Sequence, residues 1–186
     1  MRVTGGIGRG KRLRVPAGDR VRPTSDKVKQ ALFNILADRV AGAAFLDLFA
    51  GAGGVGIEAL SRGAARVVFI DDDRKSLKTI RLNVDDSGLS AKAEVIAAKV
   101  ETYIKKTEEQ FDIVFLDPPY SLGIIPLLEQ IGDSNLLKHD AVVVAEHFKK
   151  QASPKQAGAL SLYREAVYGD TVLAFYEKRG PVAGGR

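Results

Sequence analysis

The chain has 186 residues, 45% hydrophobic and 27% charged, which is typical of one soluble globular domain with its own core. It has no cysteine and two histidines, which excludes a disulfide framework, a cysteine-ligated metal or iron–sulfur centre, a thiolate nucleophile and a histidine-rich metal site. The net charge is +5, but the first 30 residues hold nine Lys/Arg and two Asp, a net +7 that leaves −2 for the rest. A basic segment on a nearly neutral body indicates a polyanionic partner, most often a phosphate backbone.

The first predicted element is a basic arm over residues 1–22. From Arg2 to Pro16, β-type residues alternate with four glycines, which favours a twisted hairpin or an extended arm over a helix. We expect its basic side chains to face solvent and to contact phosphates: Arg9, Lys11, Arg12, Arg14 and Arg22. The alternative is a solvated basic terminus without a partner.

The main domain is predicted over residues 23–179. Residues 24–40 begin with cap-type residues, and their apolar positions 28, 31, 32, 35 and 36 have the spacing of an amphipathic helix. Apolar strands then alternate with helical segments, and we expect those strands at 44–50, 66–71, 93–98, 111–117 and 141–147. This alternation indicates an α/β fold with a mostly parallel sheet and helices on both faces.

The end of the domain is predicted to differ from the rest. Two β-rich runs, 160–168 and 171–178, are separated only by Gly169-Asp170, which predicts an antiparallel C-terminal hairpin. Residues 180–186 are predicted to be a loose tail. No uncharged apolar stretch is long enough to cross a membrane, and a basic stretch rather than an apolar run follows Met1. We therefore expect a cytoplasmic protein without a membrane partner.

A glycine-rich loop follows the first strand of the predicted sheet. Gly51, Gly53 and Gly56 form a G-x-G-x-x-G pattern between a strand and a helix, where the backbone can approach a ligand closely. Asp71 ends the next strand 20 residues later, the spacing at which an acid receives ribose hydroxyls. The pattern predicts a nucleoside-containing cofactor, and the alternative is a purely structural turn.

Asp47 lies in the first strand, four residues before the glycine loop. A carboxylate there is unfavourable for the pyrophosphate of a nicotinamide cofactor but suits the ammonium group of S-adenosylmethionine. Residues 47–53, which include Phe49, resemble the first motif of Rossmann-like methyltransferases. A buried Asp hydrogen-bonded to loop amides is compatible with the same role.

The tetrapeptide at 117–120 indicates the reaction class. Asp117, Pro118, Pro119 and Tyr120 follow an apolar strand, at the edge of the sheet where open α/β folds bind ligands. The prolines fix a projection that presents a carboxylate, the Pro118 carbonyl and an aromatic ring together. The two acceptors suit the protons of an exocyclic base amine, and the ring suits base stacking. A strand-terminating turn is the alternative.

Taken together, these segments resemble the RsmD family, the 16S ribosomal RNA (guanine-N2)-methyltransferases. The resemblance covers almost the whole chain and rests on GGIGRGKRL, RPTSDKVKQALFNIL, LDLFAGAGGVGIEALSRGA, VVFID, LDPPY and YGDT. It implies a Rossmann-like methyltransferase fold, S-adenosylmethionine as cofactor, no metal, and methylation of a guanine N2 amine in 16S rRNA. It also implies an assembled or nearly assembled small subunit as partner, and we expect a monomer.

The resemblance assigns roles to individual residues. The expected cofactor residues are Asp47, Phe49, Gly51, Gly53, Gly56, Asp71 and Val100, the catalytic residues are Asp117, Pro118 and Tyr120, and the basic arm binds RNA. One position departs from the family, because Lys99 stands where relatives place an Asp or Asn that reads the adenine, and lysine has no acceptor. Either backbone groups at Lys99 and Val100 contact the adenine, or the reading residue lies one or two positions away.

Three other functions share part of this sequence pattern. An adenine-N6 or cytosine-N4 DNA methyltransferase shares the chemistry but must read a sequence, and 186 residues leave little room for a recognition domain. An NAD-dependent oxidoreductase is disfavoured by Asp47 and by the lack of a catalytic Tyr-Lys or His arrangement. A non-catalytic RNA-binding module is disfavoured by the intact tetrapeptide at 117–120.

Overall fold

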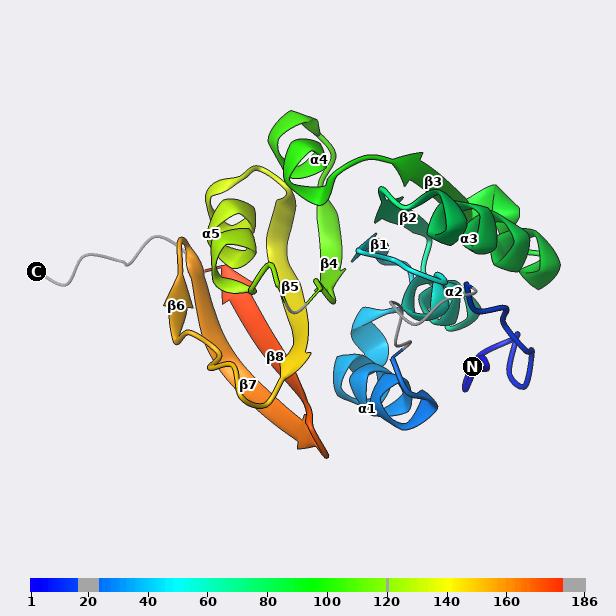
Figure 1. Ribbon diagram of the computed structural model, residues 1–186, viewed down its shortest axis with the longest axis horizontal. Coiled ribbons are helices and arrows are strands. Elements are labelled where there is room, and N and C mark those ends of the chain that lie inside the picture. Colours follow the sequence, from blue (N-terminus) through cyan, green and yellow to red (C-terminus); the bar gives the residue numbers. More distant parts are fainter. Residues whose placement is uncertain (17–23, 120, 179–186) are drawn as a thin grey trace, which may run out of the picture.

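The computed structural model, which describes residues 1–16, 24–119 and 121–178, is built on one twisted sheet (Figure 1). The sheet order among these residues is β3-β2-β1-β4-β5-β8-β7-β6. The strands are β1 Ala44–Leu48, β2 Arg66–Asp71, β3 Ala93–Ala97, β4 Phe111–Leu116, β5 Leu137–Phe148, β6 Gln156–Ala157, β7 Leu160–Tyr168 and β8 Thr171–Lys178. Strands β1 to β5 pair in parallel, and β6, β7 and β8 add an antiparallel edge, which confirms the predicted fold class.

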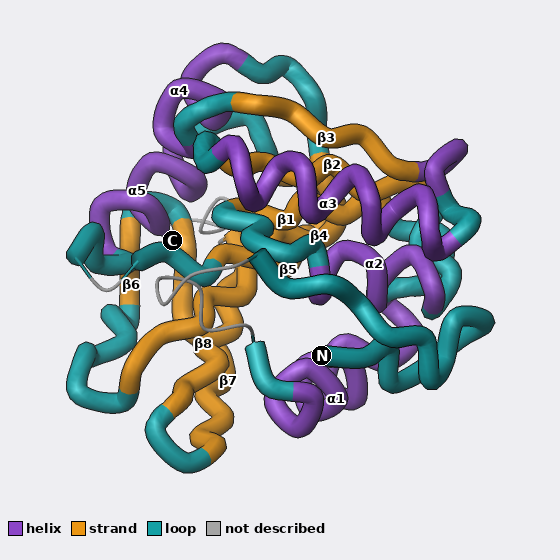
Figure 2. The backbone as a smooth tube through the Cα atoms, turned by 45° about the vertical axis from the view of Figure 1, so that its right-hand side comes forward, coloured by secondary structure: helices purple, strands orange, loops and turns teal. Residues whose placement is uncertain are grey.

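Helices cover both faces of this sheet (Figures 1 and 2). They are α1 Asp26–Leu36, α2 Gly54–Ser61, α3 Arg74–Ser87, α4 Val100–Lys106 and α5 Ile125–Asp133. Apolar side chains of α1, α2 and α3 pack in one core cluster, and those of α4 and α5 pack in a second cluster on the opposite face. Within the described ranges, no helix is both long and apolar enough to span a bilayer.

The strand order places the site. Strand β1 is flanked by β2 on one side and by β4 on the other, so the chain leaves β1 and β4 in opposite directions along the sheet. In open α/β sheets, such a change of direction leaves a crevice at the carboxyl ends of the two strands. The glycine loop follows β1 and the Asp117 tetrapeptide follows β4, so both lie at this crevice.

Helix α1 shows how the main domain closes over the first core cluster. Ser25 caps the helix by accepting a hydrogen bond from the Val28 amide, and the helix ends at Leu36, earlier than predicted, before a 3₁₀ turn. Phe33 lies off the apolar stripe expected from the sequence, yet it is 1% exposed and stacks on Phe45 at 6.4 Å. The buried face is therefore rotated from the expected one, because the helix packs against α2 and the arm as well as the sheet.

The described part of the predicted arm, residues 1–16, folds back on itself as a short hairpin loop, one of the two forms expected from the sequence. A single antiparallel bridge joins Arg2 to Arg12, and the Val3 amide donates to the Lys11 carbonyl at 3.0 Å. Val3 and Leu13 are buried in the first core cluster. Their burial fixes the loop against α2, so the arm is an integral part of the domain.

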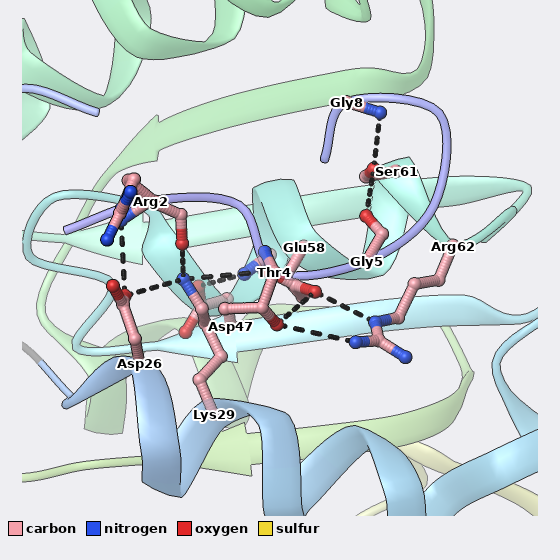
Figure 3. A network of polar contacts seen from close by, with 11 residues as sticks. Arg2, Thr4, Gly5, Gly8, Asp26, Lys29, Asp47, Glu58, Ser61 and Arg62 are labelled. Carbon is pink, nitrogen blue, oxygen red and sulfur yellow. Dashed lines mark hydrogen bonds and ion pairs between the residues drawn. The ribbon is translucent and has the colours of Figure 1, made fainter. Parts of the chain in front are cut away.

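A buried polar network binds this loop to α2 (Figure 3). The Thr4 amide and hydroxyl donate to the Glu58 carboxylate at 2.7 and 2.8 Å, and Arg62 donates to the same carboxylate at 2.8 Å. One turn along, the Ser61 hydroxyl donates to the Gly5 carbonyl at 2.6 Å and accepts from the Gly8 amide at 2.8 Å. The backbone of the loop is thus satisfied by side chains of α2.

Lys29 on α1 is the third member of the network. Its ammonium group is completely buried, lies 3.5 Å from the Glu58 carboxylate and donates to the Arg2 carbonyl. The sequence count places Lys29 among the basic charges available to a partner, and the structure corrects this. The charge is neutralised inside the protein, where it joins α1, α2 and the arm.

We predict that Glu58→Ala destabilises the protein by about 3–5 kcal/mol, because it leaves the buried Lys29 ammonium with only the partly exposed Asp26 carboxylate. The double variant Glu58→Ala, Lys29→Met removes both charges and should recover much of this loss. Urea denaturation of the wild type and the two variants measures the effect. A Glu58→Ala protein as stable as the wild type would show that the network does not hold the arm.

Candidate functional site

The glycine loop makes the turn from β1 into α2 with three residues in the left-handed region. Gly51 and Gly53 have φ of 57° and 75°, and Phe49, which is not a glycine, has φ of 59°. A bulky residue in this region is strained, and such strain persists where the surrounding structure imposes it, often at ligand sites. Gly56 serves packing instead, since a Cβ there would lie 2.2 Å from the Phe69 ring.

Asp71 braces the loop from the end of β2. One carboxylate oxygen accepts from the Gly51 amide at 2.8 Å, and the other accepts from the Asp73 amide at 2.9 Å. Partial burial raises the pKa of Asp71, against the lowering effect of these two amides. The 20-residue spacing read in the sequence therefore reflects a direct contact between Asp71 and the first glycine of the loop. Each oxygen retains a lone pair for a further donor.

Asp47 lies beneath the loop, in the buried part of β1. It is 2% exposed and accepts a hydrogen bond from the Gly56 amide at 2.9 Å. Burial raises the pKa of Asp47 to about 8; the Gly56 amide opposes this rise, and Asp71 adds to it. The hydrogen bond to a loop amide expected from the sequence is present. One amide does not offset the burial of the charge, so the ionised form needs a cation nearby.

A pocket opens at the carboxyl ends of β1 and β4, above these groups. Its lining residues come from the glycine loop, both strands and the N-terminal segments: Met1, Thr24, Asp47, Phe49, Ala50, Gly51, Ala52, Gly54, Val55, Phe115 and Asp117. Met1 and Thr24 are not among the site residues predicted from the sequence. Met1 packs so closely on the loop that a Cβ on Gly54 would lie 2.5 Å from its sulfur.

Asp117 directly follows β4 and lines this pocket, next to Pro118 and Pro119 in the sequence. Burial, followed by the nearby charges of Glu146 and Asp47, raises the pKa of Asp117 well above its usual range. Pro118 is buried and Pro119 is exposed, so the chain turns outward after the strand. Tyr120 lies outside the described residues. The pocket therefore brings together Asp47, Asp117 and two loop residues of the predicted set, Phe49 and Gly51.

Val100 and Lys99 lie at the start of α4, after β3. The Val100 side chain is 3% exposed and packs in the second core cluster, whereas Lys99 is exposed. Neither residue lines the pocket beneath the loop.

The described basic residues of the arm are on the surface. Arg9, Lys11, Arg12 and Arg14 are all exposed, and Arg22 lies outside the described residues. Arg14 pairs with Asp86 on α3 at 2.9 Å, which partly neutralises it. Its backbone is also held, because the buried Asn83 side chain accepts from the Arg14 amide and donates to the carbonyls of Arg14 and Ala52. Asn83 thus links the arm to the glycine loop.

A family model described as "Conserved hypothetical protein 95" matches residues 1–177. The chain is 32% identical to "Ribosomal RNA small subunit methyltransferase D" of Escherichia coli (strain K12), and the match covers 96% of this chain and 90% of that protein. The chain belongs to this family, the RsmD family. The family resemblance read in the sequence is confirmed, and with it the class of methyltransferases.

Two further comparisons agree with this family. The chain is 40% identical to "Putative rRNA methyltransferase YlbH" of Bacillus subtilis (strain 168), over 97% of this chain and 100% of that protein. A solved structure, "Putative methyltransferase yhhF from Escherichia coli", superposes with a TM-score of 0.85 at 33% identity, over 96% of this chain and 97% of that one. The RsmD-family fold thus extends over nearly the whole chain, arm included.

The raised pKa of Asp47 makes stability depend on pH. Because the folded state keeps this proton up to about pH 8 and the unfolded state loses it near 3.8, stability falls as pH rises through that window. We predict that wild type loses about 1 kcal/mol per pH unit relative to Asp47→Asn between roughly pH 5 and 7. Urea denaturation across this range measures the difference. Asp38→Asn, an exposed change after α1, is the control, and an Asp47→Asn curve parallel to wild type would refute the raised pKa.

Proposed function

We propose that this protein transfers a methyl group from S-adenosylmethionine to the exocyclic N2 amine of a guanine in 16S rRNA. The observation that carries the proposal is the pocket in which Asp117 and Asp47 meet beside the glycine loop, in a chain of the RsmD family. The Escherichia coli (strain K12) relative is named as a methyltransferase of small-subunit ribosomal RNA. The chemistry of the pocket supports the same reaction for this chain.

The charge of the pocket fits S-adenosylmethionine. Asp47 and Asp117 both line it, and no Lys, Arg or His is among its described lining residues. A pyrophosphate would meet two carboxylates there, whereas an ammonium and a sulfonium group would offset them. The strained Phe49 and the glycines of the loop leave the backbone open to a closely bound nucleoside.

Each cofactor residue has a role in this proposal. Asp47 holds the ammonium group, Asp71 accepts from the ribose hydroxyls while it keeps its bond to Gly51, and backbone groups near Val100 contact the adenine. Phe49, Gly51, Gly53 and Gly56 shape the loop that encloses the cofactor. When bound, S-adenosylmethionine supplies an electrophilic methyl group.

The base is held from the β4 side of the pocket. A guanine N2 amine is a weak nucleophile because its lone pair is delocalised into the ring. Asp117 and the Pro118 carbonyl accept hydrogen bonds from its two N–H groups, which directs the lone pair outward, and Tyr120 stacks on the base. The base must be unpaired to enter such a pocket, as for other enzymes that modify bases.

The arm supplies the RNA contacts. Arg9, Lys11, Arg12, Arg14 and Arg22 bind phosphates, and the described ones are exposed on a loop that is fixed to α2 and linked through Asn83 to the glycine loop. A rigid basic surface next to the pocket suits a folded substrate, so the proposed partner is the assembled or nearly assembled small subunit. The protein acts as a monomer in the cytoplasm, without a metal.

We predict that Asp71→Ala weakens S-adenosylmethionine binding by about 1–3 kcal/mol, because the ribose loses a charged acceptor and Gly51 loses its brace. Calorimetric titration measures the affinity, with NAD as a ligand expected not to bind. Asp72→Ala, an exposed change at the next position, is the control. Unchanged affinity in folded Asp71→Ala would remove Asp71 from the proposed site.

We predict that replacing Arg9, Lys11 and Arg12 with Gln lowers RNA affinity and reduces the slope of log affinity against log salt by about one unit per lost phosphate contact. Cofactor affinity should stay the same. The matched control changes Lys105 and Lys106, two exposed lysines at the end of α4, to Gln. A salt slope that does not change with the arm variant would mean that the arm is a solvated segment.

We predict that Asp117→Ala lowers the single-turnover rate by roughly two to four orders of magnitude, because the reacting amine loses its carboxylate acceptor. The assay follows a labelled methyl group from cofactor to small subunits that lack the modification. Cofactor affinity, titrated in parallel, should be largely unchanged. Transfer at the wild-type rate would refute the proposed chemistry, even with fold and cofactor correct.

A further inference from the structure

Strand β5 extends farther than β4 at the end of the sheet that carries the pocket. Leu116, the last residue of β4, pairs with Ala145 of β5. Strand β5 then continues to Phe148, where β8 begins beside it at Thr171. At about 3.3 Å per residue, these added residues carry β5 about 10 Å past the end of β4. Figure 1 shows the end of β5 and the β7–β8 turn beyond the tip of β4, on the side of the pocket that holds the Asp117 tetrapeptide.

The turn that follows β5 is held in place by hydrogen bonds. The Lys149 amide donates to the Asp170 carbonyl at 2.8 Å, which ties the turn to the β7–β8 hairpin. His147, which is 4% exposed, bonds through its two ring nitrogens to the Phe148 carbonyl at 3.0 Å and to the Ser153 hydroxyl at 2.8 Å. The backbone on both sides of the turn is therefore anchored, and the side chains between the anchors have a fixed origin.

Two lysines project from this turn into solvent, Lys149 and Lys150. The Lys150 ammonium lies 5.8 Å from the centre of the Phe148 ring. Lys149 pairs with Asp170 at 2.6 Å, and about half of each side chain is exposed. An exposed ion pair contributes little to stability, so Lys149 can exchange this carboxylate for a phosphate at little cost. Residues 149–155 hold three lysines and no acidic residue, so the segment is basic outside the N-terminal region where the sequence count placed the positive charge.

The turn and the arm lie on opposite sides of the pocket. The sheet order places β1 and β4, which form the pocket, between β2 and β5. Arg14 of the arm pairs with Asp86 of α3, the helix that follows β2, whereas Lys149 follows β5. In Figure 1 the arm lies to the right of α1 and the end of β5 lies to its left. A polyanionic strand that crosses the pocket would therefore meet exposed cations on both sides.

We propose that Lys149 and Lys150 form a second phosphate-binding site, which holds the RNA backbone on the Asp117 side of the pocket while the arm holds it on the cofactor side. This inference rests on the proposed function, which makes RNA the partner. Phosphate contacts fix the register and orientation of a nucleic acid without reading its sequence. A base that leaves its stack to reach Asp117 needs the backbone held on both sides, so the two lysines position the guanine and take no part in the methyl transfer itself.

The first test measures binding to small subunits that lack the modification. We expect the double variant Lys149→Gln, Lys150→Gln to bind more weakly at low salt and to reduce the slope of log affinity against log salt by about one unit per lost phosphate contact. Its cofactor affinity and its urea denaturation midpoint should equal those of the wild type. The matched control, Lys155→Gln with Lys178→Gln, removes two exposed lysines beside the start of β7, at the opposite end of the hairpin. A wild-type salt slope in the Lys149→Gln, Lys150→Gln variant would overturn the inference.

The second test locates the RNA on the protein. Because the chain has no cysteine, Ala152→Cys beside the turn and Ile7→Cys on the arm each supply one exposed thiol for a photocrosslinker, and both keep every lysine and arginine. We expect both variants to crosslink to rRNA in small subunits, at nucleotides on opposite sides of the target guanine. Glu177→Cys, an exposed change at the far end of β8, should give no crosslink.

Crosslinks from Ala152→Cys to a protein alone, or to nothing, would also overturn the inference. The outcome is separable from the proposed function. If the wild type transfers no methyl group to these subunits, the proposed function fails, whereas the salt slope and the crosslinks still decide whether RNA lies on the turn after β5.

Discussion

The burial of acidic side chains at the carboxyl ends of adjacent strands determines the electrostatics of the pocket in this protein. Asp47, Asp117 and Glu146 come from three adjacent strands and point to the same face. Burial, with the charge of nearby carboxylates, raises the pKa of Asp47 and of Asp117. Such a site is costly to ionise when empty and becomes favourable when a cationic ligand enters. Burying these acidic groups therefore lowers the stability of the free protein. In the proposed function, the same pocket favours an ammonium and a sulfonium group over a phosphate.

The arm and the pocket are built as one unit. Glu58 and Lys29 form the buried pair that fixes the arm loop to α1 and α2, and Asn83 joins the arm backbone to the glycine loop through Ala52. Met1 packs directly on the start of α2. The surface proposed to bind RNA phosphates and the loop proposed to enclose the cofactor thus share one support. In the proposed function, this arrangement sets the distance between the bound RNA backbone and the reacting base without a separate recognition domain.

Sequence reasoning succeeded where the signal is local. The glycine loop, Asp71 and the Asp117 turn follow from strand ends and short spacings, and the mostly parallel pairing follows from the alternation of elements. It failed where a residue's role depends on a distant partner. In the sequence, Lys29 resembles a solvated basic residue, because its partner Glu58 lies on the distant helix α2. Phe33 lies off the apolar stripe expected for α1, and it is buried because α1 packs against α2 and the arm as well as the sheet. Glu146 and Thr24 are 122 positions apart, and only the folded chain brings them together.

Mass spectrometry of nucleosides from small-subunit rRNA tests the account most directly. Cells without the gene are compared with cells complemented by the wild type or by Asp117→Ala. The account predicts that N2-methylguanosine decreases without the gene, returns with the wild type and stays low with Asp117→Ala. An N2-methylguanosine content that is the same in all strains would contradict it.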